Sequence, residues 1–108
     1  MIRIKVLKDA DGCYRELSVT GHADSVPEDE YDLICCAVSV LTINTVNALE
    51  EFTGAEFQAE ADEDGYMRIR FPEKPEADAV LLLDTLVLGL SDIAQQYSDY
   101  VEMEIKEE

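Results

Sequence analysis

The chain has 108 residues, of which 47% are hydrophobic and 31% charged, and its formal net charge at pH 7 is −17. This length suffices for one domain with one hydrophobic core. The charge predicts repulsion from nucleic acid and from acidic membranes, and attraction to a basic peptide. For charge taken alone, however, the solubility of a concentrated cytoplasmic protein is the better explanation. We find no run of about twenty apolar residues and no apolar leader, and expect neither a membrane span nor secretion.

The cysteines point to a reducing compartment. Three are present, Cys13, Cys35 and Cys36, and their number and spacing do not suggest a disulfide framework. There is no Cys-x-x-Cys motif and only one histidine, so the sequence offers no metal site. We therefore expect reduced thiols, a cytoplasmic location, and no metal or other cofactor.

The first quarter of the chain predicts a β-hairpin. Apolar and basic residues alternate over residues 2–8, which is typical of a half-buried strand. Residues 9–12 carry an Asp-Gly turn signal, and residues 13–20 are interpreted as the returning strand, which ends at Gly21.

An acidic loop and a helix are expected next. Residues 23–31 contain four acids and show no periodicity, which is typical of a loop. Asp32 is interpreted as a helix N-cap. The helix is expected to run to about Phe52, with Gly54 as its stop signal.

A second hairpin, a second helix and a final strand complete the prediction. Residues 55–62 and 65–71 flank a further Asp-Gly turn signal. Apolar residues recur at helical spacing over residues 76–97, and residues 100–106 alternate again. The order ββαββαβ predicts an α+β fold, with two helices packed on one face of a mainly antiparallel sheet and residues 1–108 forming a single domain.

His22 and Cys35 are the most informative pair of residues. His22 is the only histidine and follows a predicted strand, whereas Cys35 opens a predicted apolar helix. One loop joins the two positions, so the imidazole and the thiol can meet in space. A thiol and an imidazole are the two groups that catalysis by a thiolate nucleophile with an adjacent base requires. Taken singly, each residue is more often structural, as a capping histidine or a small buried hydrophobe.

The sequence around this pair contains Gly21-His22-Ala23, an acidic loop, and the run Asp32-Leu-Ile-Cys35-x-Ala-x-Ser39. This pattern resembles the ribosomal-processing cysteine protease (Prp) family. It implies a cytoplasmic, homodimeric endopeptidase that removes the N-terminal extension of a large-subunit ribosomal protein. It also implies that Cys35 is the nucleophile and that His22 is the catalytic histidine.

The chemistry expected of such a site is acyl transfer. Cys35 attacks the scissile carbonyl, and His22 orients the thiolate and protonates the leaving amine. Backbone N–H groups at the helix start hold the oxyanion. Asp32 caps the helix or orients His22, and Ser39, which shares a helix face with Cys35, bonds near the site or back to the preceding turn. The helix start favours a thiolate and the acidic loop opposes it, so the sign of the net effect stays open.

Partners are suggested by charge and by surplus apolar residues. The acidic loop and the net charge fit a basic N-terminal segment of a ribosomal protein as substrate, with no nucleic acid and no membrane as partners. The stretch 79–88 is apolar on more than one helix face, which a homodimer interface or deep burial would explain.

Two other functions stay open at this point. A binding protein in ribosome assembly would use its acidic residues to hold a basic ribosomal tail without cleaving it. A redox or metal sensor would use Cys35 and Cys36, although adjacent helical cysteines lack a resolving partner and further metal ligands.

Overall fold

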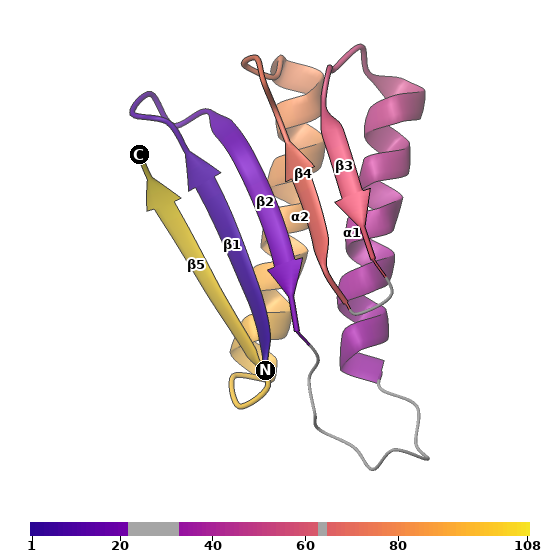
Figure 1. Cartoon of the computed structure of the whole chain (residues 1–108), viewed down its shortest axis with the longest axis vertical. Helices are drawn as coiled ribbons and strands as arrows, with labels where there is room; N and C mark the ends of the chain where they lie inside the picture. Colours follow the sequence, from indigo (N-terminus) through magenta and orange to yellow (C-terminus); the bar gives the residue numbers. More distant parts are fainter. Residues whose placement is uncertain (22–32, 63–64) are drawn as a thin grey trace.

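A computed structural model of the chain describes residues 1–21, 33–62 and 65–108. Seven elements follow the predicted order, so the expected succession ββαββαβ is confirmed (Figure 1). They are β1 (Ile2–Lys8), β2 (Tyr14–Thr20), α1 (Leu33–Phe52), β3 (Gln58–Ala61), β4 (Met67–Arg70), α2 (Ala77–Gln96) and β5 (Val101–Glu107). The predicted loop at 23–31 lies outside the described residues, as do His22 and Asp32.

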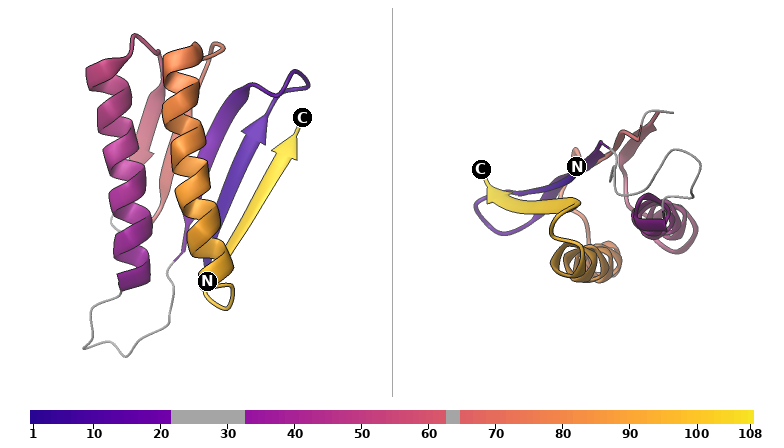
Figure 2. Two further views of the ribbon diagram at one scale, coloured as in Figure 1. Left: turned by 180° about the vertical axis from the view of Figure 1, so that it is seen from behind. Right: turned by 90° about the horizontal axis from the view of Figure 1, so that it is seen from below.

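The five strands form one mixed sheet in the order β3-β4-β2-β1-β5. The pairs β1–β2, β2–β4 and β3–β4 are antiparallel, whereas β5 runs parallel to β1. Both helices lie on the same face of the sheet, and the opposite face carries no helix (Figure 2). The prediction of an α+β fold with two helices on one face of a mainly antiparallel sheet is therefore confirmed.

The core lies between the sheet and the helices. In β1 the alternation predicted from the sequence is realised, because Ile2, Ile4 and Val6 are at most 1% exposed while Arg3 and Lys5 are exposed. The helix α2 contributes one apolar stripe to this core, made of Ala79, Leu83, Leu86 and Leu90. Burial of each large aliphatic side chain contributes about 1.5–3 kcal/mol, and this packing sustains an α1 sequence of weak helix formers.

The first helix ends where the sequence predicts, but by a different device. Gly54 is not among the glycines with positive φ, so it does not form the left-handed cap that usually accompanies such a residue. Instead, the Thr53 backbone N–H and hydroxyl both donate to the carbonyl of Leu49, and the Thr53 hydroxyl accepts from the N–H of Ala55.

By length and composition alone, α1 meets the criteria for a helix that crosses a membrane. Its threonines and asparagines nevertheless interrupt any continuous apolar run, so the expectation of no membrane span stays a prediction. Core helices of soluble proteins meet the same criteria. Here one face of α1 is buried in the fold, through Val38, Thr42, Thr45 and Leu49.

Different strands and helices begin and end at the two ends of the molecule (Figure 1). At the Cys35 end, β1 and α1 begin and β2 ends. At the opposite end, β2 and α2 begin and α1 ends. The end of β2 and the start of α1, which carries Cys35, therefore lie at the same end of the molecule.

Candidate active site

Cys35 lies in the first turn of α1. Its side chain is half-buried and packs against the edge of the hydrophobic core. The N–H groups of a first helical turn have no acceptor within the helix and favour negative charge nearby. The start of α1 is therefore one influence that favours a thiolate at Cys35.

A recess of about 260 Å³ opens beside Cys35. Its lining comes from β1, the end of β2, α1 and the β3–β4 turn: Ile2, Val19, Gly21, Cys35, Val38, Ser39, Asp62 and Gly65. Three of these side chains, those of Ile2, Val19 and Val38, are at most 7% exposed and make the recess apolar at its base. Ser39 is exposed on the same helix as Cys35, as its spacing predicts.

Gly21, which lines this recess just after β2, has a backbone conformation that glycine adopts readily. Its φ is +86°, and a Cβ atom built on it would stand 2.3 Å from the carbonyl oxygen of Met1. A side chain at position 21 would therefore push the end of β2 away from the start of β1. Gly21, the residue that precedes His22 in the sequence, therefore lines the same recess as Cys35.

Of the four predicted site residues, the structure brings Cys35 and Ser39 together, whereas His22 and Asp32 lie outside the described residues. Sequence reasoning missed the contribution of the β3–β4 hairpin. Asp62 closes this hairpin, because its backbone N–H donates to the Tyr66 carbonyl and its carboxylate accepts from the Tyr66 N–H. The Asp-Gly turn signal, combined with the element order, would have located this turn at the Cys35 end.

The other cysteines are partly exposed. A cysteine outside an active site is most often a small buried hydrophobe, but Cys13 and Cys36 are both only half-buried. Cys13 lies in the β1–β2 turn, where its N–H donates to the Asp9 carboxylate at 2.9 Å. None of the three cysteines, all within the described residues, forms a disulfide.

Among the described residues, three groups away from the recess have shifted pKa values. Burial and a hydrogen bond to Asp84 raise the pKa of Tyr14, whose hydroxyl lies 2.5 Å from the Asp84 carboxylate. The N–H of Cys13 holds the pKa of Asp9 below its usual value. A hydrogen bond to Glu16 raises the pKa of Arg68. Within residues 1–21, 33–62 and 65–108, no three His, Cys, Asp or Glu side chains are grouped in a way that would hold a metal ion.

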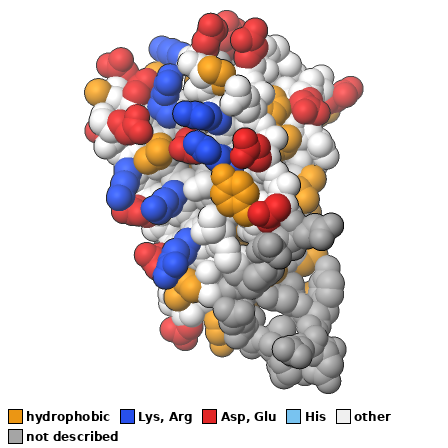
Figure 3. All heavy atoms as spheres, viewed as in Figure 1, with side chains coloured by type: hydrophobic (Ala, Val, Ile, Leu, Met, Phe, Trp, Pro, Cys, Tyr) orange, Lys and Arg blue, Asp and Glu red, His pale blue; other side chains and the backbone are white. Residues whose placement is uncertain are grey.

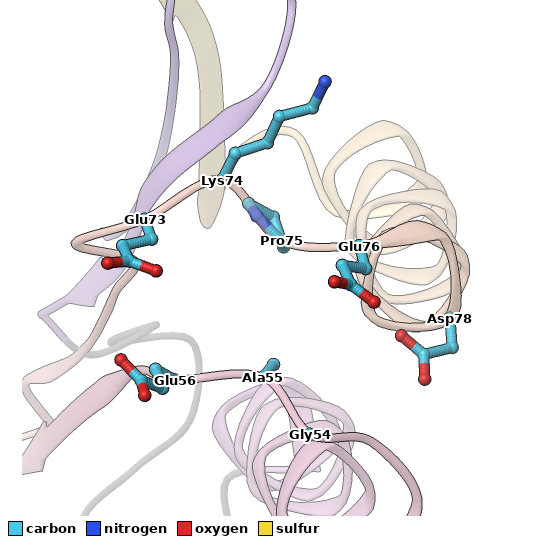
Figure 4. A pocket seen from close by; sticks show the side chains of 8 residues that line it. All are labelled: Gly54, Ala55, Glu56, Glu73, Lys74, Pro75, Glu76 and Asp78. Atoms are coloured by element: carbon cyan, nitrogen blue, oxygen red, sulfur yellow. The ribbon is translucent and has the colours of Figure 1, made fainter.

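A second recess, of about 330 Å³, lies at the opposite end (Figure 4). It is formed by the segment after α1 and the segment leading into α2. Four carboxylates stand around it, those of Glu56, Glu73, Glu76 and Asp78, and the Lys74 side chain extends away from it. Its lining includes no cysteine, serine or histidine, so it offers no nucleophile for peptide cleavage.

Comparison with known proteins identifies the family. The model of the family described as cysteine protease Prp matches residues 1–102. The chain belongs to this family. It is accordingly a cysteine protease, as the sequence resemblance implies, and the fold described above is the Prp fold.

Individual relatives agree with this assignment. The chain is 33% identical over 104 residues to the ribosomal processing cysteine protease Prp of Bacillus subtilis, covering 92% of each protein. It is 25% identical over 107 residues to the protein of the same name from Staphylococcus aureus Mu50, covering 98% of this chain and all of the relative. The crystal structure of S. aureus Prp with a covalently linked product peptide is similar, with a TM-score of 0.90, 25% identity, and coverage of 98% and 100% of the two chains.

Proposed function

We propose that this cysteine protease is a ribosomal-processing endopeptidase in which Cys35 is the nucleophile and His22 the general acid and base. The observation that carries the proposal is the shared recess: Cys35 lines it from α1, and Gly21, the residue bonded to His22, lines it from the end of β2. On this proposal, residues 1–108 act as one catalytic domain.

The reaction follows from these two groups. The Cys35 thiolate attacks the scissile carbonyl carbon, and the C–N bond breaks as His22 protonates the leaving amine. Water, deprotonated by His22, then hydrolyses the thioester and regenerates the thiol. N–H groups in the first turn of α1 are suitable donors to the oxyanion of each tetrahedral intermediate.

Asp32 and Ser39 have supporting roles in this proposal. Asp32 directly precedes Leu33, the first residue of α1, which fits the role of an N-cap. Ser39 lines the recess one helical turn after Cys35, so its hydroxyl is available to a bound peptide. No cofactor is needed for this chemistry, since both the nucleophile and the proton donor are side chains.

The proposed substrate is the basic N-terminal extension of a large-subunit ribosomal protein. Two lines of support are available. The relatives from B. subtilis and S. aureus are named ribosomal processing proteases. The net charge of −17 attracts a basic polypeptide and accelerates its encounter with the enzyme. A cytoplasmic location fits such a substrate and three cysteines outside disulfides.

A homodimer is also proposed, on the evidence of the helix surfaces. Burial within one copy accounts for only part of the apolar surplus in α2, since Leu81 is 67% and Leu88 65% exposed. On α1, Val40 is 59% and Ile43 49% exposed. Exposed apolar side chains on two adjacent helices are typical of a subunit interface. Sedimentation of the Leu81→Glu/Leu88→Glu double variant tests this, and a wild-type monomer would contradict it.

The decisive experiment is cleavage of a synthetic peptide copied from the extended N-terminus of the host's ribosomal protein. We expect wild-type protein to cleave it and Cys35→Ala to leave it intact. Cys36→Ala is the matched control, because it removes a neighbouring half-buried thiol from the same helix turn, and it should retain most activity. Tight binding by wild type without cleavage would support the acidic binding protein instead. Loss of cleavage in Cys36→Ala alone would transfer the nucleophile to Cys36.

A further inference from the structure

The turn between β3 and β4 places a carboxylate in the wall of the Cys35 recess. Among the described residues that line this recess, Asp62 is the one with a charged side chain, and none is a lysine or arginine. Seven of the eight lysines and arginines of the chain are in the strands. Figure 3 shows Lys and Arg side chains over the open face of the sheet, with acidic side chains among them. A cation that enters the recess therefore meets the Asp62 carboxylate without a competing lysine or arginine from the described lining.

Hydrogen bonds of the turn hold Asp62 in place. Its N–H donates to the Tyr66 carbonyl at 3.0 Å, and its carboxylate accepts from the Tyr66 N–H at 3.1 Å. Gly65, which also lines the recess, has a φ of +86°, a conformation that glycine adopts readily. A carboxylate has about four acceptor positions, and the Tyr66 N–H takes one of them. The Asp62 side chain is therefore ordered before a ligand arrives, which lowers the entropic cost of binding.

The surroundings of Asp62 favour contact with a cation of a bound peptide. At the base of the recess, Ile2, Val19 and Val38 are at most 7% exposed. Such apolar surface screens a nearby charge less than bulk water does. A hydrogen bond from an ammonium or guanidinium group to a carboxylate is stronger than one between neutral groups. Because Asp62 itself is exposed, the contact lies at the rim of the recess and contributes modestly to affinity.

We propose that Asp62 is a specificity residue, whose carboxylate receives a lysine or arginine side chain of the substrate close to the scissile bond. This inference rests on the proposed nucleophile, since Asp62 and Cys35 line the same recess of about 260 Å³. An extended peptide advances about 3.3–3.6 Å per residue, so a recess of this size spans only a few residues of substrate. The cation that Asp62 binds is accordingly within a few residues of the bond that Cys35 attacks.

This contact differs from the general attraction that the net charge exerts. The charge of −17 raises the local concentration of any basic peptide, wherever its lysines lie. A carboxylate at one point of the recess instead favours a cation at one position of the bound peptide. Asp62 thus selects the bond to be cleaved within a basic segment that the field of the whole protein attracts.

The test measures binding of the extended N-terminal peptide to the inactive Cys35→Ala protein by fluorescence anisotropy. Each lysine and arginine of the peptide is replaced by glutamine in turn. We expect one replacement near the scissile bond to weaken binding by about three- to fivefold more than the others do. This excess loss should disappear in Cys35→Ala/Asp62→Asn, because the contact has already been removed from the protein. The new amide oxygen can still accept from the Tyr66 N–H, so the turn stays closed.

Asp9→Asn in the same Cys35→Ala protein is the matched control. Asp9 closes the β1–β2 turn through the same two hydrogen bonds, to the carbonyl and from the N–H of Cys13, both at 2.9 Å. That turn lies at the end opposite Cys35. The control therefore removes one carboxylate from an equivalent turn and changes the net charge equally, but the excess loss at one peptide position should persist.

Several outcomes would overturn the proposal. An equal loss at every basic position, or an excess loss that Asp9→Asn abolishes as fully as Asp62→Asn, would leave only the general field of the protein. An excess loss that persists in Asp62→Asn would exclude the Asp62 contact. If Asp62→Asn unfolds, Asp62→Ser gives the same measurement, because its hydroxyl can accept from the Tyr66 N–H. Cleavage by wild type is recorded separately, and position-specific binding without cleavage would refute the proposed protease while supporting the Asp62 contact.

Discussion

The two ends of the molecule each have a recess of similar size, but they differ in chemistry. At the Cys35 end the recess has an apolar base and a half-buried thiol at a helix start. At the opposite end the recess is ringed by four carboxylates and lined by no nucleophile. Volume therefore does not distinguish the proposed catalytic recess from the second recess. A nucleophile on a rigid element, with apolar surface beside it that displaces water, does.

The largest expected effect tests how Gly21 shapes the Cys35 end. Gly21→Ala should lower kcat/KM for the peptide by about 100-fold or more, because the new Cβ would stand 2.3 Å from the Met1 carbonyl oxygen and displace the chain that leads to His22. Gly12→Ala is the matched control. It has a similar φ of +80° but nothing within 4 Å of its Cβ, and it lies at the opposite end. We expect it to retain full cleavage, and equal losses in both variants would show that backbone strain alone is responsible.

The second expected effect concerns Tyr14, at the end opposite Cys35. It should change the stability of the fold but not peptide cleavage. The pKa of Tyr14 is raised in the fold, so above pH 10 the unfolded chain loses its tyrosine proton before the folded chain does. The free energy of unfolding should then fall with rising pH, by up to about 1.4 kcal/mol per pH unit. Urea unfolding between pH 9 and 11 measures this.

Tyr14→Phe supplies the control for that measurement. It removes the hydroxyl that donates to Asp84 and should cost about 1 kcal/mol at neutral pH. The variant should also lose the Tyr14 contribution to the alkaline decline, while cleavage at neutral pH stays within about twofold of wild type. An alkaline decline as steep in the variant as in wild type would assign the effect to other tyrosines or to lysines.

The smallest expected effect concerns the recess ringed by carboxylates at the end opposite Cys35. Glu73→Gln/Glu76→Gln should leave peptide cleavage unchanged and raise the free energy of unfolding by about a few tenths of a kcal/mol, since it relieves repulsion among exposed carboxylates. Thermal unfolding and kcat/KM measured on the same preparation check both parts. A marked rise in KM would instead make the acidic recess part of the substrate path.

Local signals in the sequence predicted most of the fold, because each is decided by near neighbours. The alternation over residues 2–8 and the helical spacing over 76–97 correspond closely to β1 and α2. The strand order is set by long-range pairing, so nothing local revealed that β5 joins the sheet beside β1 and parallel to it.

The residues of the candidate site likewise fall into those that local sequence predicted and those that it did not. Cys35 and Ser39 lie four residues apart on one helix, and their common face was predictable from that spacing. Ile2, Val19 and Asp62 come from three other segments and reach the recess only through sheet pairing, which no single stretch of sequence encodes. The close approach of Gly21 to Met1 is likewise a contact between strand ends, invisible until β1 and β2 are aligned.

The pairing of the first strand with the last also constrains the order in which the fold can form. The N–H of Ile2 donates to the carbonyl of Tyr100, and β5 pairs with β1 along its whole length. A nascent chain that has not yet reached residue 101 therefore leaves one edge of β1 bare, next to a residue that lines the Cys35 recess. The part of the sheet beside that recess is therefore completed only when the last strand has joined the first.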